Sequence, residues 1–322
     1  MVIDLNTAAR PAFDLFSGFS LCATLASLET AGLLAELAAT GRLAPDSHGL
    51  GAPLLDYLAA RGIVEECGDR HRFTPLGDAI RADIGYLVWL SRGYGLPMRS
   101  IAEFVTGARG TDDHAGRDGS GVAVGSALVG ARDLVPQALD LLDGTRVTRV
   151  LDLGCGNARF LLEICRRFGA TGTGVDEDSR ACAEAEREIS AAGAAGTVSV
   201  RQLDAGDLAA LPGIAATDLV VTFFLLHEIL AAGRAALVDH LRGLARRLPA
   251  GAHLLIAEVT PATTEPGQLF SPEFTLVHAL MGQRLLDAPG WHAVLADAGF
   301  TVAREVRPTM PGALLMLARR AG

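Results

Sequence analysis

The chain beyond Val147 alternates short apolar runs with amphipathic stretches. The runs RVLDLG, GTGVD, VSVRQL, DLVVTFF and HLLIAEV have the length and composition of buried strands, and TVAREV and ALLMLARR follow near the C-terminus. Residues 158–167, 179–192 and 235–248, which separate the runs, carry apolar residues at helical spacing. This alternation predicts an α/β fold built on a doubly wound, mostly parallel sheet of seven strands.

The first part of the chain has a different pattern. Leucines recur at helical spacing up to a stop at Gly41, and a second helix is expected over 53–60. Two short strands around Gly68 and Asp69 form a predicted hairpin, and Thr74 with Pro75 opens a further helix. Together these elements resemble the outline of a winged helix.

A winged-helix outline raises the question of DNA binding. The helix in the reading position, GAPLLDYLAARG, offers Asp56 and a single arginine, Arg61, whereas DNA-reading helices present several base and phosphate contacts. The net charge of the whole chain is -9, which disfavours phosphate backbones and suits a cationic small molecule. We therefore expect a dimerisation module and no nucleic-acid partner.

Composition excludes several kinds of chemistry. All 28 basic residues are arginine, so no lysine can form a Schiff base, bind a phosphate in a Walker A loop or act as a base. The five cysteines form no CxxC pair and are expected to be small buried side chains. The longest apolar run, 219–226, is short for a membrane span, and the N-terminus has no signal-peptide layout. We expect a cytoplasmic protein without a membrane partner.

These patterns predict three regions. Residues 1–90 form the winged-helix-like dimerisation domain, 91–145 a linker and active-site lid, and 146–322 the catalytic domain. The glycine-rich stretch 93–130 is expected to be irregular, as a lid or pocket wall would be. Its cluster Asp112, Asp113 and His114 is expected to be a set of solvated turn residues.

The segment VLDLGCGNARF indicates a cofactor loop. A strand ends in Asp152, the chain turns at Gly154 and Gly156, and a helix follows, so backbone amides face a ligand that can approach closely. A dinucleotide fingerprint would have a third glycine at 159, where this chain has Arg159, which disfavours NAD.

Acids follow the next two strands. Asp176 ends the second strand, 20 residues after Gly156, at the spacing of a ribose-binding carboxylate. Asp204 and Ala205 follow the third strand and could hold an adenine edge. Each acid alone could equally be a helix cap, but their succession at strand ends indicates a nucleoside site.

The fourth strand is followed by His227 and Glu228. The carboxyl end of a strand is where open α/β sheets place their chemistry, and an imidazole titrates near neutral pH. His227 is therefore a candidate catalytic residue, and its imidazole is suited to proton transfer.

The chain from Val147 to Arg320 resembles the class I S-adenosylmethionine-dependent methyltransferases, which have a Rossmann-like sheet. The N-terminal part of the protein resembles the dimerisation domain of the small-molecule O-methyltransferases in that class, which implies a homodimer. By this resemblance, Gly154 and Gly156 flank the methionine part of the cofactor. Asp176 holds the ribose and Asp204, with Ala205, the adenine. We add Asp152 and Phe223 to the cofactor site.

A narrower resemblance is to the metal-dependent α-keto-acid C-methyltransferases, which act on phenylpyruvate or 2-ketoarginine. It lies in His227 followed by an acid, in His278 51 residues later, and in the motif Arg117-Asp118-Gly119. It implies that His227 and His278 bind a divalent or ferric ion, iron first, that assists methylation of the β-carbon of an α-keto acid. Glu228 would act in the second shell or in proton transfer, because adjacent residues point apart.

The remaining substrate contacts are inferred from residue type. The planar guanidinium of Arg117 would bind the substrate carboxylate. Trp89, Tyr94 and Phe224 would line the pocket, which slightly favours an arylpyruvate, although core packing explains them equally well. Two alternatives remain: a metal-free O-methyltransferase with His227 as base, and a winged-helix regulator that binds S-adenosylmethionine as an effector.

Overall fold

The computed structural model describes residues 11–43, 48–111, 116–263 and 271–321, so Asp112, Asp113 and His114 lie outside the described residues. The chain forms two compact units. Unit 1 comprises Met1–Arg99 and Gly116–Val129, and unit 2 comprises Ser100–Ala115 and Gly130–Gly322.

Unit 1 is mainly helical. Its elements are α1 (Pro11–Thr30), α2 (Leu33–Thr40), α3 (Gly51–Ala60), β1 (Val64–Cys67), β2 (Arg70–Phe73), α4 (Pro75–Ala82), α5 (Ile84–Val88), the π-helix η1 (Trp89–Gly93), α6 (Gly95–Arg99) and the first part of α8 (Gly119–Asp133). Strands β1 and β2 form the predicted hairpin, and Gly41 ends α2 at a φ of 71°. Thr74 caps α4 by accepting a hydrogen bond from the amide of Gly77 at 3.0 Å.

Helix α1 is longer and more apolar than the sequence patterns led us to expect. It is the one helix among the described residues that is long and apolar enough to cross a membrane by length and composition. A search for uninterrupted apolar runs overlooks it, because Asp14 and Glu29 break the run. Its second half packs into the core of unit 1 through Leu25 and Leu28, and its first half exposes Phe13, Leu15, Phe16 and Phe19.

The glycine-rich stretch 93–130 is helical at both ends, so the prediction of an irregular segment was wrong there, whereas residues 107–111 and 116–118 lie in no helix or strand. It contains α6, α7 (Ile101–Thr106) and most of the 15-residue α8. A Cβ at Gly125 would lie 2.5 Å from the backbone nitrogen of Trp89, and one at Gly85 would lie 2.8 Å from the backbone of Val129. Gly93, Gly121 and Gly125 therefore permit close packing of helices.

Unit 2 is built on a seven-stranded sheet of order β5-β4-β3-β6-β7-β9-β8. The strands are β3 (Arg149–Leu153), β4 (Thr171–Asp176), β5 (Val198–Gln202), β6 (Leu219–Phe223), β7 (His253–Val259), β8 (Phe300–Val306) and β9 (Ala313–Arg320). The pairs among β3 to β7 are parallel, and β9 is antiparallel to both β7 and β8. The predicted fold class, an α/β protein with a mostly parallel sheet behind a helical N-terminal part, is confirmed.

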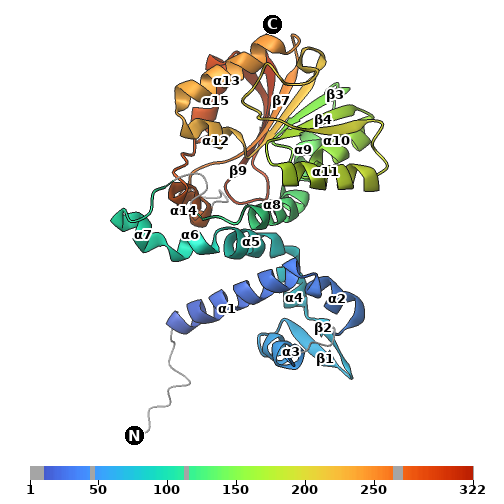
Figure 1. Ribbon diagram of the computed structural model, residues 1–322, viewed down its shortest axis with the longest axis vertical. Helices are drawn as coiled ribbons and strands as arrows, with labels where there is room; N and C mark the ends of the chain where they lie inside the picture. Colours follow the sequence, from blue (N-terminus) through green and yellow to red (C-terminus); the bar gives the residue numbers. More distant parts are fainter. Residues whose placement is uncertain (1–10, 44–47, 112–115, 264–270, 322) are drawn as a thin grey trace. The chain divides into compact units, whose positions relative to one another are not determined.

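Helices cover both faces of the sheet (Figure 1). One face carries α10 (Arg159–Phe168) and α11 (Ser179–Ala191), and the other carries α12 (Leu226–Ala231), α13 (Arg234–Arg247) and α15 (Ala288–Asp297). The remaining helices of this unit are α7, the end of α8, α9 (Val135–Leu141) and α14 (Pro272–Leu280), with a short 3₁₀ turn, η2 (Ile214–Ala216). The core between the sheet and α13 and α15 is built from apolar side chains, with Leu241, Ile256 and Trp291 among its buried members.

The cysteines follow the expectation only in part. Cys165 and Cys182 are buried, but Cys67 is exposed at the hairpin. Burial raises the pKa of the Cys165 thiol to about 11, with a further contribution from Asp152. That thiol is a packing residue and not a nucleophile at neutral pH.

Candidate active site

The cofactor loop connects β3 to α10. Gly154 and Gly156 have φ angles of 72° and 54°, which glycine adopts without a steric penalty. The amides of Gly154 and Cys155 donate to the carbonyl of Val175 at 2.9 and 3.0 Å, which ties the loop to β4. Ala158, directly before α10, is also left-handed at 60°, an uncommon conformation for a residue with a Cβ.

The two acids predicted for the nucleoside occupy different settings. Asp176, half-buried at the end of β4, accepts from the amide of Gly156 at 2.9 Å and from that of Asp178 at 3.0 Å. It therefore connects the glycine loop to the end of the neighbouring strand. Asp204 is exposed after β5, and its Oδ1 accepts from the amide of Gly206 at 2.7 Å, while Ala205 beside it is half-buried.

Asp152 is the most perturbed acid of this region. It is buried beneath the loop, and burial, assisted by the negative charge of Asp176, raises its pKa to about 7. A cation beside this carboxyl, such as a sulfonium, would stabilise its ionised form.

His227 is held by a buried acid from the next strand. Its Nδ1 lies 2.7 Å from Oε2 of Glu258, which is the second-last residue of β7 and is completely buried. Oε1 of the same carboxylate accepts from the amides of Leu226 at 2.8 Å and His227 at 3.3 Å. Because the carboxylate only accepts, Nδ1 of His227 donates the hydrogen bond.

His278 also donates a hydrogen bond from Nδ1. Its Nδ1 lies 2.6 Å from the carbonyl oxygen of Phe274, one turn earlier in α14, and a carbonyl can only accept. The rings of His227 and His278 are both buried, with centroids 5.0 Å apart at 77°. The structure therefore brings together two histidines that are 51 residues apart in sequence.

The acid that holds His227 was missed in the sequence. We assigned Glu228 to the second shell or to proton transfer, and it is half-buried on α12, whereas the carboxylate bonded to Nδ1 of His227 is that of Glu258. The available signal was the acid within the apolar run HLLIAEV, because a charged residue inside a buried strand requires a partner. Among the described residues there is no group of three or more His, Cys, Asp or Glu side chains arranged to hold a metal.

Two phenylalanines end β6 beside the cofactor loop. Phe223 stacks on Phe160 of α10 with centroids 4.4 Å apart, and its ring meets Phe224 edge-on at 6.4 Å. Phe224 has a φ of 55°, so the backbone just before His227 is held in a sparsely populated conformation. Such conformations cluster at functional sites.

The remaining predicted residues belong to unit 1. Trp89 and Tyr94 are buried, and their rings pack at 4.5 Å, as a core pair would. Arg117 is half-buried directly before α8. Their assignment to the substrate pocket stays a prediction.

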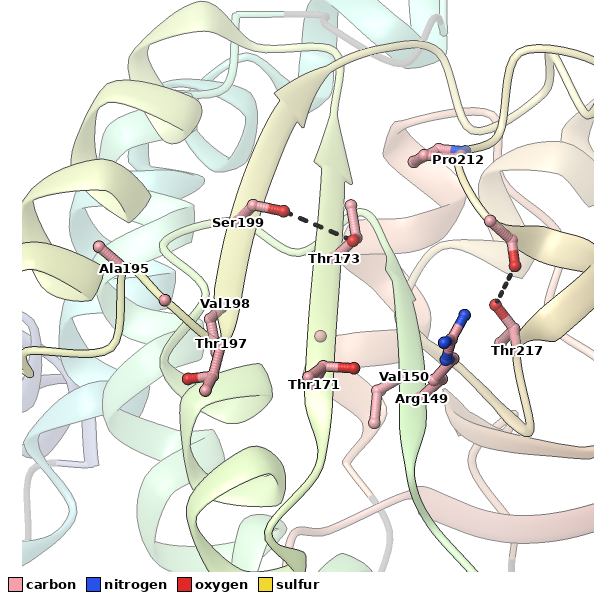
Figure 2. A pocket seen from close by; sticks show the side chains of 13 residues that line it. Arg149, Val150, Thr171, Thr173, Ala195, Thr197, Val198, Ser199, Pro212 and Thr217 are labelled. Atoms are coloured by element: carbon pink, nitrogen blue, oxygen red, sulfur yellow. Dashed lines mark hydrogen bonds between the residues drawn. The ribbon is translucent and has the colours of Figure 1, made fainter.

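A hollow of about 290 Å³ lies away from these residues. It is lined by Arg149, Thr171 and Val198, which are the first residues of β3, β4 and β5, so it lies at the amino ends of the strands. Figure 2 shows its hydroxyl-rich wall, where Thr173 and Ser199 pair at 3.5 Å. Parallel α/β sheets bind their ligands at the opposite, carboxyl ends.

Comparisons with known proteins match this geometry. Residues 150–249, which span β3 to α13, match the family model described as a methyltransferase domain. The chain is 29% identical over 265 residues to an indolepyruvate C-methyltransferase of Streptomyces griseus, covering 80% of this chain and 76% of the relative. It is 28% identical over 303 residues to a 2-ketoarginine methyltransferase of Streptomyces arginensis, covering 88% and 86%.

A solved O-methyltransferase family protein from Burkholderia thailandensis has the same fold, with a TM-score of 0.66 and 20% identity over 98% of this chain and 99% of that one. The domain match, the named relatives and the cofactor loop define the class. The chain contains a methyltransferase domain, and it is an S-adenosylmethionine-dependent methyltransferase.

Titration of Asp152 should make cofactor affinity depend on pH. Below pH 7 the carboxyl is protonated in the unliganded protein and must lose its proton to face the sulfonium, so S-adenosylmethionine affinity should rise with pH and level off above about 7. S-adenosylhomocysteine, which lacks the sulfonium charge, should show a weaker dependence. Calorimetric titrations between pH 5.5 and 8.5 test this, and Asp152→Asn is the control that removes the titrating group. Equal pH profiles for the two ligands in the wild type would refute the assignment.

Removal of the charge on Glu258 should impair catalysis without affecting the cofactor. Glu258→Gln keeps an acceptor for the backbone amides but weakens the bond that orients His227, so kcat should fall about 10- to 100-fold. The affinity for S-adenosylhomocysteine should be unchanged, which also checks folding. Glu163→Gln, which removes an exposed carboxylate paired with Arg166 in the same unit, is the matched control, and an unchanged kcat in Glu258→Gln would refute the orienting role.

Proposed function

We propose that the protein methylates the β-carbon of an α-keto acid, with an arylpyruvate slightly favoured. The observation that carries this proposal is the buried pair His227 and His278, whose Nδ1 atoms are both engaged by acceptors. The similarity to an indolepyruvate C-methyltransferase and a 2-ketoarginine methyltransferase supports the same substrate class.

The chemistry of the two histidines fits a metal ion. Both donate from Nδ1, so Nε2 is the nitrogen that would bind the ion, and the Glu258–His227 bond is of the kind that orients ligating histidines in metalloenzymes. We propose that they hold a divalent or ferric ion, iron in the first instance, and leave other positions for substrate and water. When bound, the ion would withdraw charge from the keto group and make the hydrogens of the β-carbon more acidic.

The other residues bind and orient the reactants in this proposal. Arg117 binds the substrate carboxylate, and Trp89, Tyr94 and Phe224 line the pocket. The β-carbon loses a proton, for which Glu228 is the candidate acceptor, and attacks the methyl group of the cofactor. A carbon–carbon bond forms, the carbon–sulfur bond breaks, and S-adenosylhomocysteine leaves.

The cofactor occupies the carboxyl ends of β3 to β6 in this assignment. The glycine loop, with Asp152 below it, faces the methionine part, and Phe223 lies beside it. Asp176 binds the ribose, and Asp204 with Ala205 binds the adenine.

A second candidate is a metal-free O-methyltransferase with His227 as general base. The same Glu258–His227 bond favours it, since a carboxylate on Nδ1 raises the basicity of Nε2. A small-molecule hydroxyl would then replace the β-carbon as nucleophile.

The variant His278→Ala separates the two candidates. Wild-type protein should carry about one metal ion per chain, exchange the β-hydrogens of indolepyruvate in deuterated water, and transfer a methyl group to it. His278→Ala should lose all three properties, whereas His292→Ala, which replaces an exposed histidine of the same unit, should lose none. If the protein holds no metal and His278→Ala still transfers methyl groups, C-methylation is ruled out and O-methylation with His227 as base remains.

We further propose a cytoplasmic homodimer, with residues 1–90 as the dimerisation domain, 91–145 as linker and lid, and 146–322 as the catalytic domain. The exposed apolar residues at the start of α1 support a covered surface, and a second copy of the chain, not a membrane or a nucleic acid, is the proposed partner.

Light scattering on the purified protein should give about twice the mass of one chain. Phe16→Asp places a charge on the exposed face of α1 and should shift the protein toward the monomer. Val105→Asp, at an exposed apolar residue of unit 2, is the control. A wild-type mass of a single chain would refute the dimer.

A further inference from the structure

The carboxylate of Asp118 is at the centre of a local network in unit 1. Its Oδ1 accepts from the amides of Ser120 at 3.0 Å and Gly121 at 3.2 Å, which caps the first turn of α8. Its Oδ2 accepts from Nε of Arg92 at 3.0 Å, and its own amide donates to the carbonyl of Gly93 at 2.8 Å. A second nitrogen of Arg92 donates to the hydroxyl of Ser120 at 3.0 Å.

The backbones of η1 and α8 are also in close contact beside Asp118. A Cβ at Gly121 would lie 2.7 Å from the side chain of Arg92 and 2.8 Å from the amide nitrogen of Gly93, and a Cβ at Gly93 would lie 2.8 Å from Val122. The start of α8 therefore rests directly on the π-helix η1 that carries Arg92. The position of the chain at Asp118 is set from two sides, by the glycine contact and by the guanidinium.

The pKa of Asp118 is consistent with its pairing with Arg92. Partial burial alone would raise the pKa of Asp118, but the hydrogen bond from Arg92 and those from the amides outweigh it, and the pKa is lowered. Asp118 is therefore ionised at neutral pH and remains paired with Arg92. Both side chains stay partly exposed, at 43% and 39%, and exposed ion pairs contribute little to stability. Orientation is the more consequential effect of the pair.

We propose that Arg92 is a positioning residue which, through Asp118, sets the direction in which Arg117 presents its guanidinium to the substrate. The proposal rests on the proposed function, in which Arg117 binds the substrate carboxylate. Bidentate recognition of a carboxylate by a guanidinium depends on orientation, so loss of the neighbouring anchor should weaken substrate binding and leave the cofactor site unchanged.

The test is a double-mutant cycle on the full-length protein with indolepyruvate as substrate. Arg92→Ala should raise the KM for indolepyruvate about five- to tenfold, with the KM for S-adenosylmethionine unchanged and kcat changed less than KM. Arg92→Lys, which can still pair with Asp118 but cannot reach Ser120 with a second nitrogen in the same fork, should have an intermediate KM. Arg72→Ala is the matched control, because it removes an exposed arginine ion pair with Glu65 from the same unit.

The cycle separates failure of this proposal from failure of the proposed function. If Arg92→Ala has no further effect in an Arg117→Ala background, the two residues act as one unit, as proposed. If it raises KM equally in both backgrounds, or if it acts like Arg72→Ala, Arg92 does not position Arg117. If Arg117→Ala itself leaves KM unchanged, the role of Arg117 in the proposed function is wrong.

An unfolded Arg92→Ala protein would not end the test. Asp118→Asn keeps an oxygen to cap α8 and removes the charge that holds Arg92, so it should reproduce the rise in KM. Affinity for S-adenosylhomocysteine reports folding in every variant. A folded Asp118→Asn protein with wild-type KM would overturn the proposal.

Discussion

The site depends on one constraint of the sheet, which is that β3 to β7 run parallel and end at the same edge. The order β5-β4-β3-β6-β7 places Asp204, Asp176, the glycine loop, His227 and Glu258 at the ends of successive neighbouring strands. Residues separated by up to 104 positions in sequence, such as Gly154 and Glu258, thereby line one edge. An antiparallel arrangement of the same strands would divide them between two edges.

Within that edge, the buried carboxylate of Glu258 organises the chemical end. It accepts from two backbone amides and from one imidazole, so the first turn of α12 and the ring of His227 are fixed by the same group. A buried acid is tolerated in a strand only when its lone pairs are satisfied in this way. At the cofactor end, burial of Asp152 leaves an acid whose pKa of about 7 suits a cationic ligand.

The sequence was most informative where a local pattern decides the structure. Strand and helix periodicity predicted the sheet and its covering helices, and Gly154, Gly156 and Asp176 lie at the turns where the motif placed them. The same reasoning failed for α8, because a glycine-rich segment has the composition of a loop. Its glycines are needed for contact with Trp89 and Gly93, and that contact cannot be read from the helix alone.

The sequence by itself determined the class of fold, the cofactor loop and the identity of the two histidines, because each is recorded in residue type and spacing along a single segment. Only the tertiary structure decided that the carboxylate of Glu258 holds His227 and that the rings of His227 and His278 meet. These are contacts between elements far apart in the chain. They are set by strand register and helix packing, which depend on how all the apolar faces are buried together.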